Sequence, residues 1–306
     1  MELKKIGINF LYLTNLILYI LALKALNYYF HVDNIFLSCL MFGLFFPILF
    51  FTFLIKKMVL TKIELISGII DYVQLILLYV SINKLNIAEY LSFRTFSLFF
   101  NMILSYVFLK KSIDKSTIFG NCIILISCCV LLGLGGINNL FYAVCTLSSS
   151  FLYSLLGFLM EKYKEENNYI SSKMISNFLN ITTYLIYSLF NNSVNEIIEK
   201  NMNYFFFFLI FFISFSEVFY YWTKYLIIKI TENGSVFTNI LDVIRRVITL
   251  ILGIILFKDV YPPYLLICFG FILIGCIFIN FSGKINEIGK KIYEKIMGKK
   301  FQELPS

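Results

Sequence analysis

Six ionisable side chains lie deep inside long apolar stretches of the sequence, where each one needs a partner, a water-filled cavity or a functional reason. They are Asp71, Arg94, Glu217, Asp242, Arg245 and Arg246. On insertion scales, an ionised side chain at the centre of a bilayer costs about 2.5–3.5 kcal/mol. Buried bases can bind an anionic solute, and buried carboxylates can orient those bases or carry a proton. We therefore take these six residues as candidate substrate-binding residues.

The signs and spacing of these charges favour an anionic solute. Lys24 and Lys224 lie nearer the ends of apolar stretches, where a long side chain can extend to the membrane surface. With these two lysines, the stretches hold five bases and three acids, an excess of two positive charges. Asp242 and Arg245 share a helix face, so they can also form a purely structural ion pair. Arg246 points about 100° further round the helix and is less able to use the same partner.

Other kinds of chemistry find little support. The chain has one histidine, His31, which we place in a loop at the membrane edge. Its seven cysteines fall within or at the start of apolar runs, so we expect small buried hydrophobic residues. The sequence offers neither a histidine-based metal cluster nor a nucleophile with an adjacent base. We therefore expect no enzymatic activity, no metal and no cofactor.

The composition identifies the elements that carry these charges as membrane-spanning helices. Of the 306 residues, 59% are hydrophobic and 14% are charged, whereas soluble domains have about 25% charged residues. Ten apolar runs approach the length of about 20 residues that a spanning helix needs. They fall at 7–30, 35–55, 63–82, 88–109, 117–135, 140–160, 172–190, 203–228, 235–257 and 262–282. This pattern argues against a soluble enzyme or a nucleic-acid module, and it predicts an all-α polytopic membrane protein with ten transmembrane helices.

The distribution of lysine predicts that both termini lie in the cytosol, where the loops between spans are enriched in positive charge. With the N-terminus inside, the inside segments contain 18 lysines, Lys173 among them. The outside segments contain three, which are Lys84, Lys200 and Lys258. We interpret the first apolar run as an uncleaved span, because removal of a signal peptide would break the even number of spans.

The sequence also contains an internal repeat. Shifted by 148 positions, residues 82–135 align without a gap on 230–283, with nine identities in 54 positions. Two halves of five spans each must enter the membrane in opposite orientations, as inverted repeats do. We predict an N-terminal five-helix repeat within 1–160, a cytosolic linker at 161–171, the remainder of a C-terminal repeat at 172–282, and an amphipathic cytosolic tail at 283–306. The C-terminal repeat begins with the sixth run, at about 140.

Several residues keep the spacing found in a known family. Asp71, Tyr79-Val80, Asn83, Arg94, Ser105 and Phe108-Leu109 resemble helices 3 and 4 of the nucleotide-sugar-transporter-like carriers, solute carrier family 35, especially its F branch. Leu241-Asp242, Arg245 and Val247 resemble the Leu-Asp-x-x-Arg-x-Val stretch of helix 9, and Lys24 and Met160-Glu161-Lys162-Tyr163 stand where the family has similar residues. The resemblance implies the drug/metabolite transporter superfamily, with ten helices, two inverted five-helix repeats and a central cavity lined mainly by helices 3, 4, 8 and 9.

The chain departs from the F branch at several positions. Leu91 and Thr95 stand where that branch tends to have Gln and Gly, and Glu217 and Arg246 are additional charges. The Arg245-Arg246 pair is also similar to the Lys-Arg pair with which sugar-phosphate translocators hold phosphate. These differences leave the substrate open.

Together these features predict a secondary membrane transporter of a small organic metabolite that works by alternating access. The expected substrate is anionic or phosphorylated, such as a nucleotide sugar, and is bound by Arg94, Arg245 and Arg246. One alternative is a carrier of cations, drugs or amino acids similar to the chloroquine-resistance type, in which Asp71 and Glu217 face the substrate. Another is a non-transporting membrane scaffold.

The expected surroundings follow from the same interpretation. The partners are a small-molecule substrate and the lipid bilayer, without nucleic acid, and a homodimer is left open. We expect an endomembrane location, in the Golgi, the endoplasmic reticulum or a lysosome-like vacuole.

Overall fold

The computed structural model describes most of the chain, and the regular secondary structure in the described part is helical. The described residues are 2–30, 35–58, 60–82, 84–85, 87–110, 115–134, 140–163, 168–190, 193–201, 203–231, 234–257 and 263–280. The predictions made for His31 and for the tail at 283–306 lie outside these residues.

The predicted apolar runs coincide with helices. The helices are α1 (Glu2–Phe30), α2 (Ile35–Gly43), α3 (Phe46–Ile55), α4 (Lys62–Ile82), α5 (Ile87–Arg94), α6 (Phe96–Leu109), α7 (Lys115–Leu134), α8 (Leu140–Lys162), α9 (Tyr169–Phe190), α10 (Ser193–Lys200), α11 (Tyr204–Ile230), α12 (Gly234–Phe257) and α13 (Pro263–Asn280). Each of the ten runs corresponds to one helix or to two consecutive helices. Helices α8 and α9 extend into the predicted linker at 161–171, so the connection between them is shorter than expected.

Two of the predicted runs are interrupted in the middle. Helices α2 and α3 are separated by a turn at Leu44 and Phe45. Pro47 follows in the first turn of α3, where the missing N–H of proline is tolerated. Helices α5 and α6 are separated at Thr95, where the backbone N–H groups of Thr95 and Leu98 bond to carbonyls three residues earlier. The second interruption directly follows Arg94, a predicted site residue.

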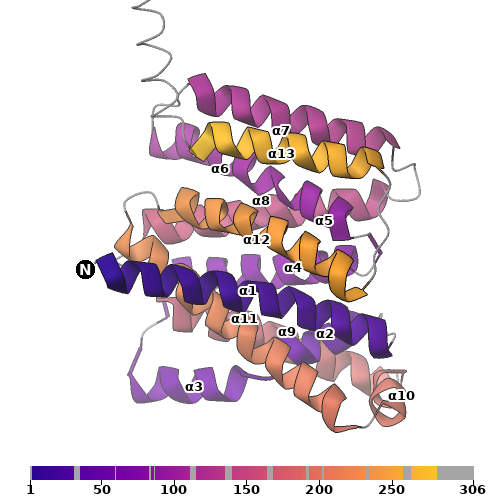
Figure 1. The fold of residues 1–306 in the computed structure, drawn as a ribbon. Coiled ribbons are helices and arrows are strands. Elements are labelled where there is room, and N and C mark those ends of the chain that lie inside the picture. Colours follow the sequence, from indigo (N-terminus) through magenta and orange to yellow (C-terminus); the bar gives the residue numbers. More distant parts are fainter. Residues whose placement is uncertain are drawn as a thin grey trace, which may run out of the picture.

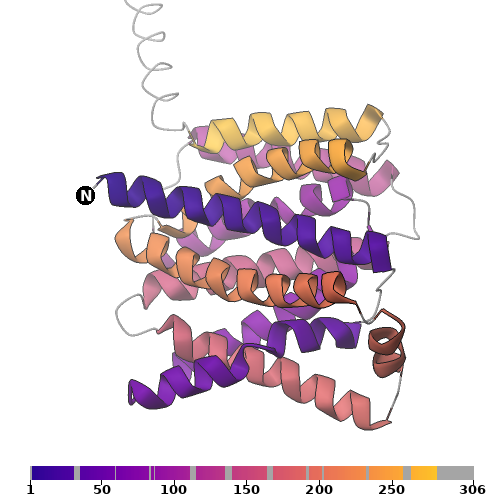
Figure 2. The same ribbon diagram turned by 60° about the horizontal axis from the view of Figure 1, so that its bottom comes forward.

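The helices lie side by side with their long axes in broadly similar directions (Figures 1 and 2). Helices α7 and α13 pack together along one edge of the molecule. Helix α1 packs on α11 and α12, and α8 packs on α4, α5 and α6. Helices α2 and α3 pack on α9, which also contacts α4. The central helices therefore come from distant parts of the sequence.

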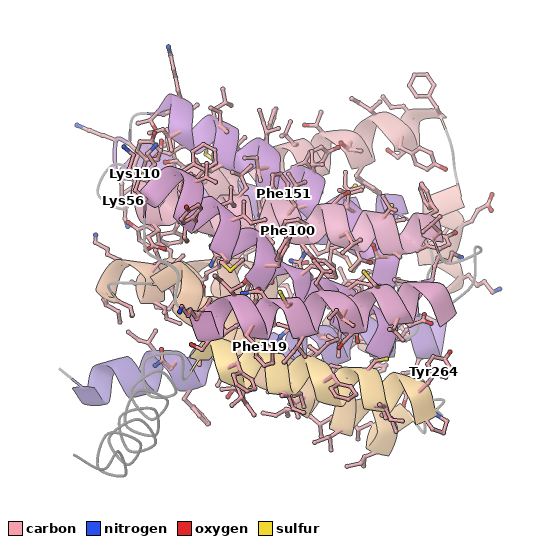
Figure 3. The ribbon with its side chains drawn as sticks, turned by 90° about the horizontal axis from the view of Figure 1, so that it is seen from above. Lys56, Phe100, Lys110, Phe119, Phe151 and Tyr264 are labelled. Atoms are coloured by element: carbon pink, nitrogen blue, oxygen red, sulfur yellow. The ribbon has the colours of Figure 1, made fainter. Side chains whose placement is uncertain are left out.

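The two ends of the helices differ in the residues that they present. Lys56 and Lys110 lie at one end, and Tyr264, near the start of α13, lies at the opposite end (Figure 3). The N-terminal end of α1 lies on the same side as the two lysines (Figures 1 and 3). Three sites that were predicted to lie on the cytosolic side are thus found at one end of the molecule.

The distribution of polarity is the inverse of that in a soluble protein. Large apolar side chains are exposed over the outer helices, as at Phe190 (86% exposed), Ile55 and Phe119. Serine, threonine, asparagine and charged side chains are buried in the interior. An exposed apolar surface of this extent suits lipid, in which helices satisfy their own backbone hydrogen bonds. The cysteine prediction is wrong for Cys122 and Cys129, which lie exposed on α7, whereas the other five are buried.

Five segments are long and apolar enough to cross a membrane. They are Ser38–Ile55, Lys62–Ile82, Glu89–Phe108, Leu140–Lys162 and Tyr204–Ile230. Shorter apolar segments lie within α1, α7 and α13. The protein is therefore a helical membrane protein.

Helices α4 and α9 approach so closely that only a glycine fits at the crossing. A Cβ atom placed on Gly68 would lie 2.7 Å from the carbonyl oxygen of Ser172 and 2.6 Å from Cβ of Ile175. Gly68 is one helical turn before Asp71, and Ser172 directly precedes Lys173. This crossing therefore brings two charged side chains towards each other.

We predict that Gly68→Ala lowers the thermal stability of the purified protein. The added methyl group must displace the backbone of α9, and such overpacking costs about 1–3 kcal/mol. Gly270→Ala is the matched control, because a Cβ atom there meets nothing within 4 Å and alanine favours a helix over glycine. Thermal unfolding in detergent, followed by intrinsic fluorescence, measures both variants. A Gly68→Ala protein that melts with the wild type would contradict the close contact.

Candidate binding site at the centre of the helices

A small cavity lies among α1, α4, α5, α8, α11 and α12. Its lining residues are Leu16, Tyr19, Ile20, Asp71, Gln74, Leu75, Leu78, Tyr90, Arg94, Tyr153, Glu217, Tyr220, Asp242 and Arg245. Five of the six predicted site residues line it, and Arg246 does not. Its volume of about 40 Å³ accommodates a few water molecules but is far below the roughly 300–1,000 Å³ of ligand pockets.

The first charged cluster joins three helices through one ammonium group. Nζ of Lys173 on α9 donates to Oδ2 of Asp71 on α4 at 2.7 Å, and it also donates to the Glu217 carboxylate on α11. The side chain of Lys173 is 0% exposed, and the two carboxylates are buried as well. The cluster carries one net negative charge when all three groups are ionised.

Lys173 was counted among the lysines of the inside segments, but it lies within a helix and is fully buried. Helix α9 begins at Tyr169, so Lys173 is already in its second turn and faces the interior. A sequence signal was available, because Lys173, Asn177 and Asn180 recur at helical spacing and are all fully buried. Asp71 and Glu217 were expected to orient arginines, but their ion-pair partner is this lysine.

The second cluster lies on α12 and is centred on Asp242. Nε of Arg245 is 3.6 Å from Oδ1, and Nη2 of Arg246 is 3.8 Å from Oδ2 of this carboxylate. The hydroxyl of Tyr12 on α1 also donates to Oδ1 at 3.3 Å. Arg246 was expected to be less able to share this partner, but its position one turn after Asp242 lets the long side chain reach back. The cluster carries one net positive charge.

Arg246 also holds the interruption between α5 and α6. Its Nη1 donates to Oγ1 of Thr95 at 2.7 Å, and its Nη2 lies 3.4 Å from Oγ of Ser97. The hydroxyl of Thr95 in turn donates to the carbonyl of Leu91 at 2.9 Å. These contacts give Arg246 a structural role at the broken helix, which explains why it does not line the cavity.

Serine side chains of α8 bind backbone groups of the same broken segment. Ser154 donates to the carbonyl of Ser97 at 2.7 Å, and Oγ of Ser150, which is 2.8 Å from the carbonyl of Thr146 in its own helix, also lies 3.4 Å from the carbonyl of Phe93. Backbone carbonyls at membrane depth need such partners, because lipid supplies none. The small hydroxyl residues of α8 therefore let an irregular backbone exist at the centre of the protein.

Arg94 and Lys224 belong to neither cluster, and both contact Tyr153 of α8. Cζ of Arg94 lies 4.6 Å from the centroid of the Tyr153 ring, and its Nη1 donates to Oγ of Ser149 at 2.7 Å. Nζ of Lys224 lies 3.4 Å from the same centroid. The prediction that Lys224 extends to the membrane surface is wrong. Its side chain is 1% exposed, and residues before and after it in α11 are buried as well. The side chain of Lys24 is outside the described part.

Three tyrosine hydroxyls connect this ring to the Asp242 cluster. Tyr220 donates to the hydroxyl of Tyr153 at 2.8 Å, and the hydroxyls of Tyr12 and Tyr153 are 3.4 Å apart. Since Tyr12 donates to Asp242, the chain of hydroxyl groups runs from α8 to α12. The site therefore presents both carboxylates and cationic groups. Hydrogen bonds between tyrosine hydroxyls hold the aromatic rings in fixed positions beside these groups.

Comparison with known proteins shows that similar folds occur among solved structures. Among solved structures, 28 chains match the protein, and one of them, described only as the crystal structure of a protein, gives a TM-score of 0.62 with 14% sequence identity. The match covers 93% of this chain and 99% of the other. No protein-family model matches the sequence, and no curated protein does. At this level of identity the likeness concerns the fold alone.

We predict that Lys173→Met strongly destabilises the protein. The substitution leaves the Asp71 and Glu217 carboxylates buried without their cation, and breaking a buried pair in this way costs about 3–5 kcal/mol. Replacing all three groups, as in Lys173→Met combined with Asp71→Asn and Glu217→Gln, is expected to restore most of the loss. Thermal unfolding and the monodisperse fraction on size-exclusion chromatography measure both.

Lys162→Met provides the control for this experiment, because Lys162 is an exposed lysine at the end of α8. Its stability is expected to equal that of the wild type. If the Lys173→Met and wild-type proteins melt together, the ammonium group does not hold the three helices.

Proposed function

We propose that the protein is a secondary transporter of a small organic anion that works by alternating access. The supporting observation is the convergence of Asp71, Arg94, Glu217, Asp242 and Arg245 on one cavity inside a helical membrane protein. Charged residues inside a membrane usually mark a substrate or ion pathway, because lipid penalises them otherwise. A cavity of about 40 Å³ has no room for a metabolite, so substrate entry requires the helices to move apart.

We infer ten spans arranged as two inverted five-helix repeats. The packing of the helices is reciprocal, which supports this arrangement. The first apolar run, α1, packs on the eighth and ninth runs, α11 and α12, whereas the sixth run, α8, packs on the third and fourth, α4 with α5 and α6. The fifth and tenth runs, α7 and α13, pack on each other. Two equivalent halves that exchange partners in this way would place a site between them.

The resemblance to solute carrier family 35 supports the same proposal. The residues that carry it include Asp71, Arg94, Asp242 and Arg245, and all four line the cavity. Helix α11 contributes Glu217 and Tyr220, so the cavity is bounded by the helices that the family uses for its substrate site. A nucleotide sugar or a related phosphorylated compound is the substrate class that we propose.

A second candidate is a carrier of cations or amino acids. The observation that favours it is the charge of the Lys173 cluster, in which two carboxylates face one ammonium group. A cationic substrate could take the place of Lys173 beside Asp71 and Glu217. A scaffold without transport activity requires that all buried charges be paired, and within the described residues Arg94 and Lys224 have no carboxylate partner within 4.0 Å.

We predict that both termini lie in the cytosol, on the same side of an endomembrane. Without Lys173, which is buried, the inside segments still hold 17 lysines against three outside. Epitope tags at the two ends should both be digested when protease is added to sealed vesicles with the cytosolic face outward. A tag inserted beside Lys200 serves as the protected control. Opposite accessibility of the two ends would exclude an even number of spans.

We predict that the purified protein in proteoliposomes takes up a phosphorylated solute. The panel comprises nucleotide sugars, sugar phosphates and cationic amino acids, with protein-free liposomes as the blank. Arg94→Gln should raise the KM of the transported anion about ten- to hundredfold, because it removes a charge-assisted hydrogen bond. Phe119→Leu on the exposed face of α7 is the matched control and should transport normally.

The two candidate functions give different results in this assay. Uptake restricted to cationic solutes, lost in Asp71→Asn and in Glu217→Gln but not in Arg94→Gln, would favour the second candidate. If no solute enters faster than into the blank, transport of these classes is excluded.

A further inference from the structure

Lys224 is a buried cation with no carboxylate within 4.0 Å in the described part of the protein. Its side chain is 1% exposed, and its Nζ makes no hydrogen bond there. The contact that it makes is with the face of the Tyr153 ring, 3.4 Å from the centroid. A cation–π contact offsets part of the cost of burying an ammonium group, but it provides no neutralising charge.

Arg94 shares the same ring and also has no carboxylate within ion-pair distance among the described residues. Because the 4.6 Å and 3.4 Å distances run to one centroid, the two positive charges are close neighbours. Like charges at this separation repel each other, and the repulsion is largest where water is scarce. An arrangement that keeps two such cations together is stabilised when an anion binds.

The charges of the other groups in the middle of the helices cancel. The Lys173 cluster has one net negative charge, and the Asp242 cluster has one net positive charge. The buried carboxylates of Glu64 and Glu89 lie in the first turns of α4 and α5. The described buried charges sum to zero when Glu64 and Glu89 are counted; without these two helix-end carboxylates, Arg94 and Lys224 account for an excess of two positive charges.

We infer that Arg94 and Lys224, on the ring of Tyr153, form a binding subsite for a phosphoryl dianion of the transported solute. The inference rests on the transport function proposed above and assigns a residue, Lys224, that the sequence analysis placed at the membrane surface. A phosphate monoester or a diphosphate carries about two negative charges and several acceptor oxygens, which match one ammonium and one guanidinium group. The dianion takes over from the ring as the partner of both cations.

The same contacts distinguish this subsite from the two arginines of α12. Arg245 and Arg246 already share the Asp242 carboxylate, and Arg246 is further engaged by Thr95 and Ser97. Displacing Arg246 would remove its contacts from the broken helix, whereas displacing Arg245 would leave Asp242 beside Arg246. Arg94 and Lys224 lose only a ring contact, and for Arg94 one serine contact, when an anion binds.

Tyr153 separates Lys224 from the cavity in this structure, in which the cavity is too small for a metabolite. Tyr153 lines the cavity and Lys224 does not, so the ring covers the ammonium group. The hydroxyl of Tyr153 is held by Tyr220 and lies near that of Tyr12. Movement of α1 or α11 would change these contacts and release the ring, which couples exposure of Lys224 to opening of the cavity.

The test measures binding to the purified protein in detergent, without a transport step. The probes are inorganic phosphate and glucose 6-phosphate as phosphoryl dianions, succinate as a dicarboxylate, and lactate as a monoanion. Affinity is measured by isothermal titration calorimetry. We expect the phosphoryl compounds to bind most tightly and Lys224→Met and Arg94→Gln each to weaken their binding at least tenfold. Lys224→Arg, which keeps the charge, should retain most of the affinity.

Lys229→Met is the matched control. Lys229 is on the same helix and lies 5.9 Å from the ring of Tyr225, but it is exposed, so its replacement should leave phosphate binding unchanged. Stability in the absence of ligand gives a second measurement. Because Lys224 has no anionic partner to strand, Lys224→Met should melt at the same temperature as the wild type or higher, unlike Lys173→Met. A lower melting temperature together with normal phosphate binding would assign Lys224 a structural role and overturn the inference.

The outcomes separate this inference from the transport proposal. If uptake occurs but Lys224→Met and Arg94→Gln bind phosphoryl compounds as the wild type does, the subsite is wrong and transport stands. If the wild type binds succinate or lactate as tightly as glucose 6-phosphate, the assignment of a phosphoryl dianion is wrong. If phosphoryl compounds bind and the two variants lose them, but no solute of the panel is transported, the subsite stands and the transport proposal fails.

Discussion

Lys173 holds three helices together through one ammonium group, and the arrangement of the other buried charges depends on it. By binding both Asp71 and Glu217 it engages two carboxylates that could otherwise pair with Arg94 and Lys224. Buried ion pairs are often no more stable than apolar residues of the same size. Stability alone therefore does not account for an interior that holds ten described charged side chains, namely Glu64, Asp71, Glu89, Arg94, Lys173, Glu217, Lys224, Asp242, Arg245 and Arg246. A role in binding accounts for them better.

The number and bounds of the main helices could be predicted from the sequence, because apolar runs of about 20 residues leave few other structures in lipid. Helix α4, for example, begins and ends within one residue of the predicted 63–82. Helix α10 was not predicted, since its segment Ser193–Lys200 is polar and apolar runs indicate only apolar helices. The helix ends near the linker were also displaced, because polar residues of α9 that face the interior look like loop residues in a hydropathy profile.

The candidate site was predicted less completely than the fold. Five of the six candidate residues line one cavity, since charges in apolar runs need a polar environment inside the protein. Their pairing could not be predicted, because it depends on which helices are neighbours and on rotation about each helix axis. Lys173 and Lys224 illustrate this: the spacing of Lys173 with Asn177 and Asn180 indicates a buried face, but the partners of both lysines follow only from the packing of α4, α8, α9 and α11. The interruption at Thr95 has a similar origin, because its partners on α8 and α12 are distant in sequence.

The three-way contact of Lys173 has a consequence for how this sequence can change over evolutionary time. Loss of Lys173 alone leaves two buried carboxylates without a cation, whereas loss of either carboxylate leaves a neutral lysine–carboxylate pair. Lys173 can therefore be lost at low cost only together with both carboxylates, so changes at position 173 are expected to covary with changes at 71 and 217. Gly68 is constrained together with these positions. The close crossing of α4 and α9 that it permits sets the distance between Lys173 and Asp71. Descendants of this chain should therefore keep the glycine wherever they keep the triad.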